Sequence, residues 1–309
     1  MNKKKFLLII SIIIGMILVI IFLNFNRKEE QKSEKIKIVT SFYPLYFFTS
    51  EIVGDKAEVI NLTPAGAEPH EYEPTARDVS IIEDSNLLVL NDGGLEGWGE
   101  NVKNNLDKNK TKIIVAGDGL TTKTKEDEEN NSLEVIDPHI WLSPVLAIEM
   151  VEKIEIGISE VDPNNSSFYK ANAEALKEKL NVLDNEFKQG LLTCGSKNII
   201  TSHSAFAYLA SSYGLNQVSV AGLSTEEEPS SKQLSEITKF AKTNNIKFIF
   251  FESLISPKLS ETIAKEVGAQ TLVLNPIEGL TEDEIKSGKD YFSEMRNNLT
   301  NLKIALECK

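Results

Sequence analysis

The fold of this chain is decided by the stretch from Asp162 to Leu192, which reads DPNNSSFYKANAEALKEKLNVLDNEFKQGLL. Apolar residues recur in it at the three- and four-residue spacing of one helical face: Ala173, Leu176, Leu180, Leu183, Phe187 and Leu191. Asp162 is suited to cap a helix and Pro163 to its first position. At a rise of about 1.5 Å per residue, the helix would span roughly 40 Å, so it can run alongside two lobes.

Short β-branched segments alternate with helical patterns on both sides of this helix. We expect strands at 36–42, 57–63, 86–91 and 111–117 before it, and at 197–202, 216–221, 246–252 and 269–275 after it. Helices are expected at 43–53, 75–84, 97–106 and 144–161, and at 204–213, 231–243, 257–267 and 282–306. Such alternation is typical of parallel sheets covered on both faces.

The predicted fold class is therefore α/β, with two lobes that each hold a parallel four-stranded sheet flanked by helices. One long backbone helix joins the lobes. The expected boundaries are residues 29–161 for the N-terminal lobe, 162–193 for the linking helix and 194–309 for the C-terminal lobe. A chain of 309 residues is long enough to give both lobes a core.

The N-terminus differs in composition from the rest of the chain. Three lysines precede an uninterrupted apolar run from Phe6 to Leu23, which is just long enough to cross a bilayer. No small-residue cleavage site follows, and no cysteine is placed to take a lipid. We expect residues 1–28 to be an uncleaved membrane anchor with the body on the extracytoplasmic side. A cleaved signal peptide is the alternative.

Beyond residue 28 the chain carries 28 basic and 46 acidic residues, a formal charge of −18. Such a surface does not attract nucleic acid or anionic lipid, which excludes these classes of partner. It is compatible with handling cations.

The only two cysteines, Cys194 and Cys308, are expected to form a disulfide in an exported protein, with two free thiols as the alternative. In the chain-entropy model this bridge would stabilise the fold by about 4–5 kcal/mol.

The three histidines of the chain all lie after predicted strands. His70 lies in TPAGAEPHEYEPT, His139 in DPHIWLSP and His203 in ITSHSAF. A single histidine is more often structural, but ligands of doubly wound sheets bind beyond the carboxyl ends of the strands. Imidazole nitrogens are preferred zinc ligands, and a fourth donor would complete a tetrahedron. Two acidic residues compete for that place, Glu278 in LNPIEGL and Glu252 at the end of FIFFE.

Several motifs, taken together and in order, resemble a known family. They are GAEPHEYEPTARDV, DPHIWLSP, ITSHSAFAYLA, GLSTEEEPSSKQL and LNPIEGLTEDEIKSGKDYF, arranged around the central helix. This combination is similar to the extracytoplasmic metal-binding proteins of zinc and manganese ABC importers, of the zinc-uptake type. The resemblance runs from about Ile36 to the C-terminus. It implies two α/β lobes, a rigid linking helix and a metal in the cleft between the lobes.

The resemblance implies four metal ligands, which fall on His70, His139, His203 and Glu278. In the family a histidine at the third position goes with zinc, whereas manganese members tend to carry a carboxylate there. Independently, three nitrogens and one oxygen suit Zn²⁺, while Mn²⁺ prefers oxygen-richer sites of higher coordination. Affinity alone would not exclude copper or nickel.

Two features depart from the family pattern. Zinc members often carry a histidine-rich loop between the first two ligands, whereas residues 118–136 here are polar and acidic and hold no histidine. We expect this segment to be a mobile surface loop. Many members are lipoproteins, and here the membrane anchor would replace the lipid.

The expected function is a tethered, monomeric solute-binding protein, not an enzyme, that captures Zn²⁺ and delivers it to an ABC permease. The alternatives are a manganese or broader divalent-metal binding protein of the same type, and a surface adhesin with an incidental metal. A third is a zinc hydrolase with Glu252 or Glu71 as general base in place of a Glu278 ligand. No HExxH, GxSxG or phosphate-binding glycine loop occurs in the sequence, which argues against hydrolysis.

Overall fold

The computed structural model describes residues 15–16, 35–91, 93–125, 134–223 and 229–309. By its internal contacts the chain divides into two compact units, residues 1–35 and 36–309. The predicted membrane anchor lies outside the described residues, except for Gly15 and Met16. Among the helices of the described ranges, none is both long and apolar enough to cross a membrane.

The first lobe is built on a parallel four-stranded sheet in the order β2-β1-β3-β4. Its strands are β1 (Ile36–Thr40), β2 (Ala57–Asn61), β3 (Leu87–Leu90) and β4 (Lys112–Val115). Its helices are α2 (Tyr43–Val53), α3 (Ala76–Glu83), α4 (Gly99–Asn105) and α5 (Pro144–Val161). Strand β3 is buried along its whole length, as expected for a sheet covered on both faces. The predicted order of strands and helices in this lobe is confirmed.

The second lobe repeats this plan with four parallel strands. They are β7 (Asn198–Thr201), β8 (Asn216–Ser219), β9 (Phe248–Phe251) and β10 (Gln270–Val273), with helices α7 (Ala207–Tyr213), α8 (Ser231–Thr243) and α9 (Lys258–Val267). The strands are hydrogen-bonded in two pairs, β7 with β8 and β9 with β10, and β7 lies beside β9. The predicted four-stranded sheet of this lobe is thus divided into two pairs. Strands of four residues form few hydrogen bonds with a neighbour, so a small separation of β7 from β9 is enough to break the pairing between them.

The linking helix is α6 (Ser166–Gly190), preceded by one 3-10 turn, η2 (Pro163–Asn165). Asp162 does not cap α6 as predicted. Its carboxylate instead accepts hydrogen bonds from Asn165 Nδ2 and the Tyr169 hydroxyl, both at 2.6 Å. These bonds stabilise the tight turn, so the α-helix begins at Ser166.

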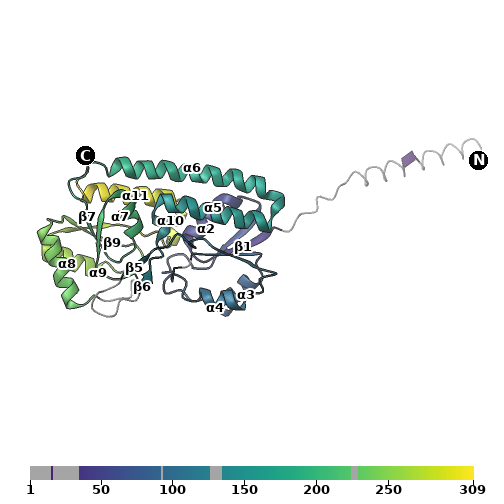
Figure 1. Ribbon diagram of the computed structural model, residues 1–309, viewed down its shortest axis with the longest axis horizontal. Coiled ribbons are helices and arrows are strands. Elements are labelled where there is room, and N and C mark those ends of the chain that lie inside the picture. The colour runs from purple at the N-terminus through teal and green to yellow at the C-terminus, as the bar shows by residue number, and fades with distance from the viewer. Residues whose placement is uncertain (1–14, 17–34, 92, 126–133, 224–228) are drawn as a thin grey trace, which may run out of the picture. The chain divides into compact units, whose positions relative to one another are not determined.

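The apolar face of α6 is buried as the spacing predicts. All six apolar residues, from Ala173 to Leu191, are at most 3% exposed. The helix packs against α2 and α5 of the first lobe and against α11 (Tyr291–Ala305) of the second, and Figure 1 shows it running along one side of both. One rigid element therefore fixes the distance between the lobes.

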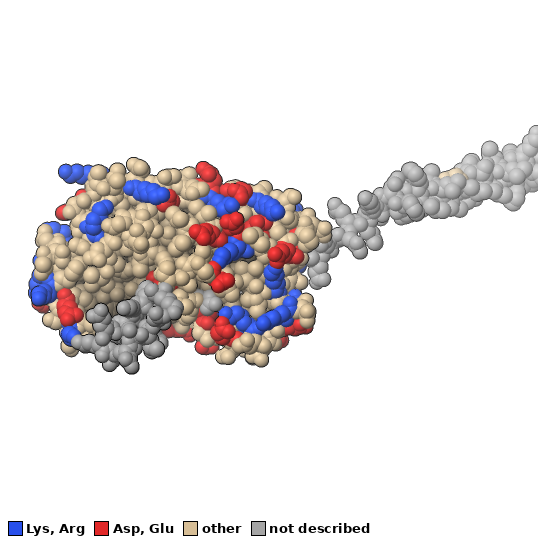
Figure 2. Space-filling model, in the orientation of Figure 1, with Lys and Arg blue, Asp and Glu red and all other residues tan. Residues whose placement is uncertain are grey.

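The outer surface carries charges of both signs. On the face shown in Figure 2, Lys and Arg side chains are interspersed with Asp and Glu side chains, and neither sign forms a continuous field. Pairs such as Lys179 with Glu51 (2.8 Å) and Arg296 with Glu186 (2.8 Å) join α6 to both lobes. Exposed pairs of this kind each contribute about 1 kcal/mol at most.

The predicted C-terminal helix 282–306 is wrong in one respect, because two helices occupy it. Helix α10 (Glu282–Lys286) ends before Gly288, whose φ of +80° a helix does not accept. Helix α11 begins anew after Asp290, whose side chain accepts a hydrogen bond from Ser293 N at 2.7 Å. A glycine followed by an N-cap aspartate is a readable stop and start signal.

The predicted mobile loop 118–136 is also partly wrong. Its two ends form a short antiparallel hairpin, β5 (Lys123–Lys125) with β6 (Glu134–Ile136). The β-branched residues Thr124, Val135 and Ile136 favour such pairing. Residues 126–133, at the centre of the predicted loop, lie outside the described residues.

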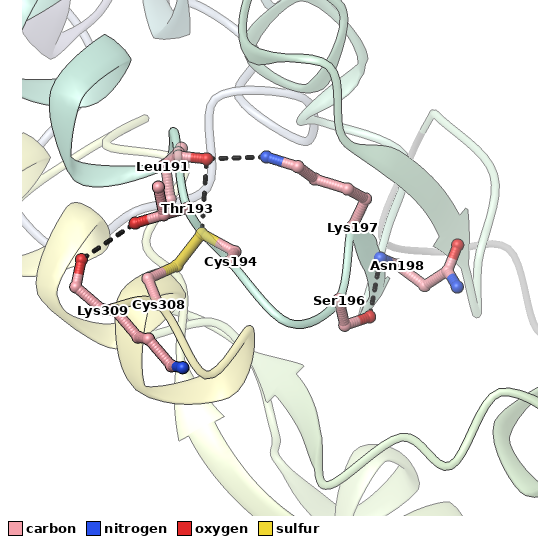
Figure 3. The surroundings of a disulfide bond; sticks show 8 residues. All are labelled: Leu191, Thr193, Cys194, Ser196, Lys197, Asn198, Cys308 and Lys309. Atoms are coloured by element: carbon pink, nitrogen blue, oxygen red, sulfur yellow. Dashed lines mark hydrogen bonds between the residues drawn. A yellow bond between two sulfur atoms is a disulfide. The ribbon is translucent and has the colours of Figure 1, made fainter.

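The predicted disulfide is present between Cys194 and Cys308 (Figure 3). It joins residues 114 positions apart, just after α6 and just after α11. Beside it, Lys309 N–H donates to the Thr193 carbonyl and the Thr193 hydroxyl donates to the Lys309 carbonyl, both at 3.0 Å. These two hydrogen bonds hold Lys309 next to the disulfide.

Replacing both cysteines by alanine should lower the free energy of unfolding by about 4–5 kcal/mol in the chain-entropy model, because the bridge closes a long loop. Equilibrium denaturation in urea measures this loss. Adding a reductant should destabilise the native sequence by a similar amount and leave the double variant unchanged. A native protein insensitive to reductant would show that the bridge does not contribute to stability.

Candidate metal centre

The four predicted ligands lie together, with one donor atom from each within 4.8 Å of the others. His139 Nε2 is 3.2 Å from His70 Nε2 and 3.3 Å from His203 Nε2. Glu278 Oε1 is 3.2 Å from the Nε2 atom of His139, and 3.5 Å from the Nε2 atoms of both His70 and His203. Metal bonds of about 2.0–2.1 Å in a tetrahedron place ligand atoms roughly 3.3–3.4 Å apart. Five of the six edges here are close to that length.

Both lobes contribute to this cluster. His70 lies in the loop after β2, and His139 immediately precedes the 3-10 turn η1 (Ile140–Leu142) that leads into α5. His203 follows β7, and Glu278 lies in the loop after β10. The parallel topology brings the carboxyl ends of these strands to one edge, so residues distant in sequence converge.

Three of the four side chains are shielded from water. His139, His203 and Glu278 are at most 1% exposed, and the His70 side chain is 9% exposed. Both carboxylate oxygens of Glu278 are buried, and neither has a hydrogen-bond partner of ordinary geometry. A buried carboxylate without a partner is costly. A divalent cation held at Oε1 by the three imidazoles would satisfy it.

Two further carboxylates orient the buried imidazoles. His139 Nδ1 lies 2.8 Å from Asp137 Oδ1, and His203 Nδ1 lies 2.6 Å from Glu252 Oε1. A carboxylate that accepts a hydrogen bond from Nδ1–H leaves the Nε2 lone pair free for a metal. The structure thus places Glu252 behind the ring of His203, whereas Glu278 faces the Nε2 atoms. The sequence reasoning missed Asp137, although its position two residues before His139 was a signal.

The loop that carries Glu278 is held in an unusual conformation. Ile277 is β-branched and has a φ of +57°, a backbone region that such residues rarely adopt. Its N–H donates to Asn275 Oδ1 at 2.8 Å, and Asn275 itself is held by both backbone atoms to the Asn298 side chain of α11. Helix α11 therefore imposes the turn that points Glu278 at the histidines.

Trp141 connects the two loops that carry His139 and Glu278. Its indole Nε1–H donates to the Pro276 carbonyl at 2.7 Å, and the Tyr291 hydroxyl donates to the Trp141 carbonyl at 2.6 Å. The indole ring is fully buried. The sequence gives no local signal for this contact, because its partners lie far apart along the chain.

Three members of the cluster, His139, His203 and Glu278, have shifted pKa values. Burial alone would lower the pKa of His139 and His203, but their carboxylate neighbours outweigh it, so the pKa of His139 is raised and that of His203 is raised well above its ordinary value. Burial would raise the pKa of Glu278, but the three histidines hold it well below its usual range. Both shifts favour protonated imidazoles beside an ionised Glu278.

The carboxyl group of Glu68, near the cluster, has a raised pKa, in contrast to that of Glu278. Burial, together with the negative charge of Glu278, raises the pKa of Glu68 to about 9, so this carboxyl is neutral at pH 7. Its Oε1 accepts a hydrogen bond from the backbone N–H of His70 at 3.3 Å. Glu68 thus fixes the His70 loop without adding a second negative charge to the centre.

Two α/β lobes on one long linking helix, with a buried cluster of three histidines and one glutamate between them, define a metal-binding protein. Residues 38–305 match the family described as "Zinc-uptake complex component A periplasmic", and the chain belongs to that family.

Individual relatives agree with this assignment. The chain is 43% identical over 92% of its length to the "Zinc-binding lipoprotein AdcA" of Streptococcus pneumoniae, of which it spans 58%. It is 38% identical over 91% of its length to the "High-affinity zinc uptake system protein ZnuA" of Bacillus subtilis, of which it spans 90%. The crystal structure of the Zn(II)-bound ZnuA-like domain of pneumococcal AdcA superposes with a TM-score of 0.76 at 42% identity, covering 89% of this chain and all of that domain.

Glu252→Gln should weaken zinc binding by about 10- to 100-fold, because the amide orients His203 less firmly and no longer strengthens its basicity. Competition titration against a chromogenic chelator measures this loss. Glu155→Gln is the matched control, since Glu155 is a buried carboxylate of α5 that bonds to Ser159, outside the metal centre. Equal zinc affinity in the two variants would contradict the role of Glu252.

Proposed function

We propose that this protein captures Zn²⁺ outside the cell with His70, His139, His203 and Glu278 and delivers it to an ABC permease. The observation that carries the proposal is the near-tetrahedral convergence of three Nε2 atoms on Glu278 Oε1, at 3.2–3.5 Å, in a site where three of the four side chains are buried. The family membership supports it, as do the zinc-binding descriptions of the relatives.

The donor set favours zinc over manganese. Three imidazole nitrogens and one carboxylate suit four-coordinate Zn²⁺, whereas Mn²⁺ prefers more oxygen donors. Two nearby carboxylates, Asp137 and Glu252, are each hydrogen-bonded to a histidine Nδ1 atom. These two carboxylates therefore orient the histidine rings and do not add oxygen donors to the metal site.

The geometry disfavours zinc hydrolysis. A catalytic zinc ordinarily keeps one coordination position for water, but Glu278 faces the position that would be left by three histidines. A general base must reach that water, whereas Glu252 bonds to the opposite nitrogen of the His203 ring and Glu71 is exposed. The proposed activity is therefore binding and release without chemistry.

Several features support an extracytoplasmic location. A disulfide between Cys194 and Cys308 is typical of exported proteins. The apolar run from Phe6 to Leu23 is suited to hold the body at the membrane, in the place that a lipid takes in lipoprotein relatives. Because three ligands are buried, release of zinc requires their loops to separate, and docking on a permease would supply that change.

Calorimetric titration of residues 29–309 with Zn²⁺ and Mn²⁺ in parallel tests the proposal. We expect one tight zinc site per chain and much weaker manganese binding. Comparable affinities would change the proposal to a broader divalent-metal binding protein, and no tight binding of either would overturn it. Copper and nickel titrations establish how far selectivity rests on the donor set.

His203→Ala should weaken zinc binding by more than the roughly 10- to 100-fold typical of an outer partner, because a direct ligand is lost. Glu278→Ala should weaken it less, because three nitrogens remain and water can take the fourth position. Circular dichroism checks that both variants fold. Ser204→Ala is the control for zinc binding and should keep the native affinity. Unchanged zinc affinity in His203→Ala would refute the ligand assignment.

Zinc affinity should fall as the pH is lowered, and the fall should begin above pH 6.5, because the pKa values of His139 and His203 are raised and both must lose a proton to bind. In the metal-free protein the same histidines stabilise the fold when the pH is below their pKa in the unfolded chain. This contribution is lost as the pH rises through their pKa in the folded protein. The increase in Tm caused by zinc should therefore grow between about pH 5 and pH 8. An increase independent of pH would contradict histidine ligation.

A further inference from the structure

A tyrosine of the second lobe fastens the base of the β5–β6 hairpin. Thr122 and Asp137 flank this hairpin, and Asp137 N–H donates to the Thr122 carbonyl at 3.3 Å. The hydroxyl of Tyr208, from α7, lies between their backbones. It accepts a hydrogen bond from Thr122 N–H at 2.7 Å and donates one to the Asp137 carbonyl at 2.9 Å. One side chain thus connects both strands of the hairpin to the other lobe.

The same contact leads to the metal centre. The carboxylate of Asp137 holds His139 at two points, with Oδ1 2.8 Å from the ring Nδ1 and 3.0 Å from the backbone N–H. The other oxygen, Oδ2, is buried without a hydrogen-bond partner. The position of Asp137 therefore depends on its backbone, where Tyr208 bonds.

Tyr208 is also close in sequence to the histidine of its own lobe. It lies on the segment that follows His203, and α7 packs beside η1, which begins just after His139. The side chain is 9% exposed, and burial raises the pKa of its hydroxyl, which stays protonated and able to donate. A single hydroxyl thus holds the segments of His139 and His203 together across the lobes.

We propose that Tyr208 is a positioning residue for zinc capture, which fixes Asp137 and through it the His139 ring. This proposal rests on the proposed zinc-binding function. A zinc ion bonded to His139 and His203 would fix the His139 ring, and through its Nδ1 contact it would hold Asp137 against Tyr208. By reciprocity, binding of zinc stabilises the hydrogen bonds of Tyr208, and these bonds strengthen the binding of zinc. The base of the β5–β6 hairpin then becomes more firmly held when zinc is bound.

The helix that carries Tyr208 also offers a matched control. Tyr213 lies on α7, is 8% exposed and donates its hydroxyl hydrogen bond to Asp184 of α6 at 3.2 Å. Tyr208→Phe and Tyr213→Phe each remove one hydroxyl from the same helix. Only the first variant removes a contact that leads to the metal centre.

Stopped-flow kinetics with Zn²⁺ and a competing chelator distinguish a positioning role of Tyr208 in zinc binding from a purely structural role. In Tyr208→Phe we expect zinc to dissociate about 3- to 10-fold faster, less than the roughly 10- to 100-fold loss for a direct orienting partner, with association unchanged. Tyr213→Phe should dissociate zinc at the native rate, even where its metal-free Tm falls. Native dissociation in Tyr208→Phe, or equal acceleration in both variants, would overturn the proposal.

Amide hydrogen exchange at Thr122 gives a second readout, because its N–H donates to the Tyr208 hydroxyl. In the native chain we expect zinc to slow this exchange. In Tyr208→Phe the amide should exchange faster and respond less to zinc. A native protein that binds no zinc would refute the proposed function, whereas zinc binding with unchanged exchange in Tyr208→Phe would refute the role of Tyr208 alone.

Discussion

The structure depends on one buried carboxylate. Glu278 lies beneath three imidazoles with neither oxygen engaged in an ordinary hydrogen bond, in a region from which water is excluded. Burying such a charge without a partner is unfavourable, so the arrangement is stable only when protons on the histidines or a cation balance it. Competition between protons and zinc for the same nitrogen atoms then follows. The fold brings three imidazole nitrogens and one carboxylate oxygen into a nearly tetrahedral arrangement that a divalent metal ion would fit.

The rest of the fold serves to hold these donors in place. Parallel strands bring the loops to one edge, and α6 contacts both lobes along its length, which limits how far they separate. Trp141 joins the loops of His139 and Glu278, and Ile277 at positive φ directs the carboxylate inward. Preorganised donors lose less entropy on binding, while the hydrogen bonds between the loops are few enough to be broken for release.

Local patterns were sufficient to predict most elements and to select the candidate ligands. The apolar face of α6, the strands and the three histidines after strands are all encoded in nearby residues. The break at Gly288 was readable but was overridden by the apolar spacing on either side. The separation of β7 from β9, and the bonds of Trp141 and Tyr208 to distant segments, depend on tertiary packing. The residues alone left Glu278 and Glu252 open as the fourth donor, and the family resemblance pointed to Glu278. In the structure Glu278 faces the Nε2 atoms, while Glu252 bonds to the His203 Nδ1 atom.

The most direct test is a crystal structure of the zinc-loaded protein with anomalous diffraction recorded at the zinc edge. The account predicts one strong peak per chain, bonded to the Nε2 atoms of His70, His139 and His203 and to Glu278 at about 2.0–2.2 Å. It also predicts that Asp137 and Glu252 remain on the Nδ1 atoms. A zinc ion bound elsewhere, or held by the three histidines with water in place of Glu278, would contradict it. The latter result would reopen the case for a hydrolytic centre.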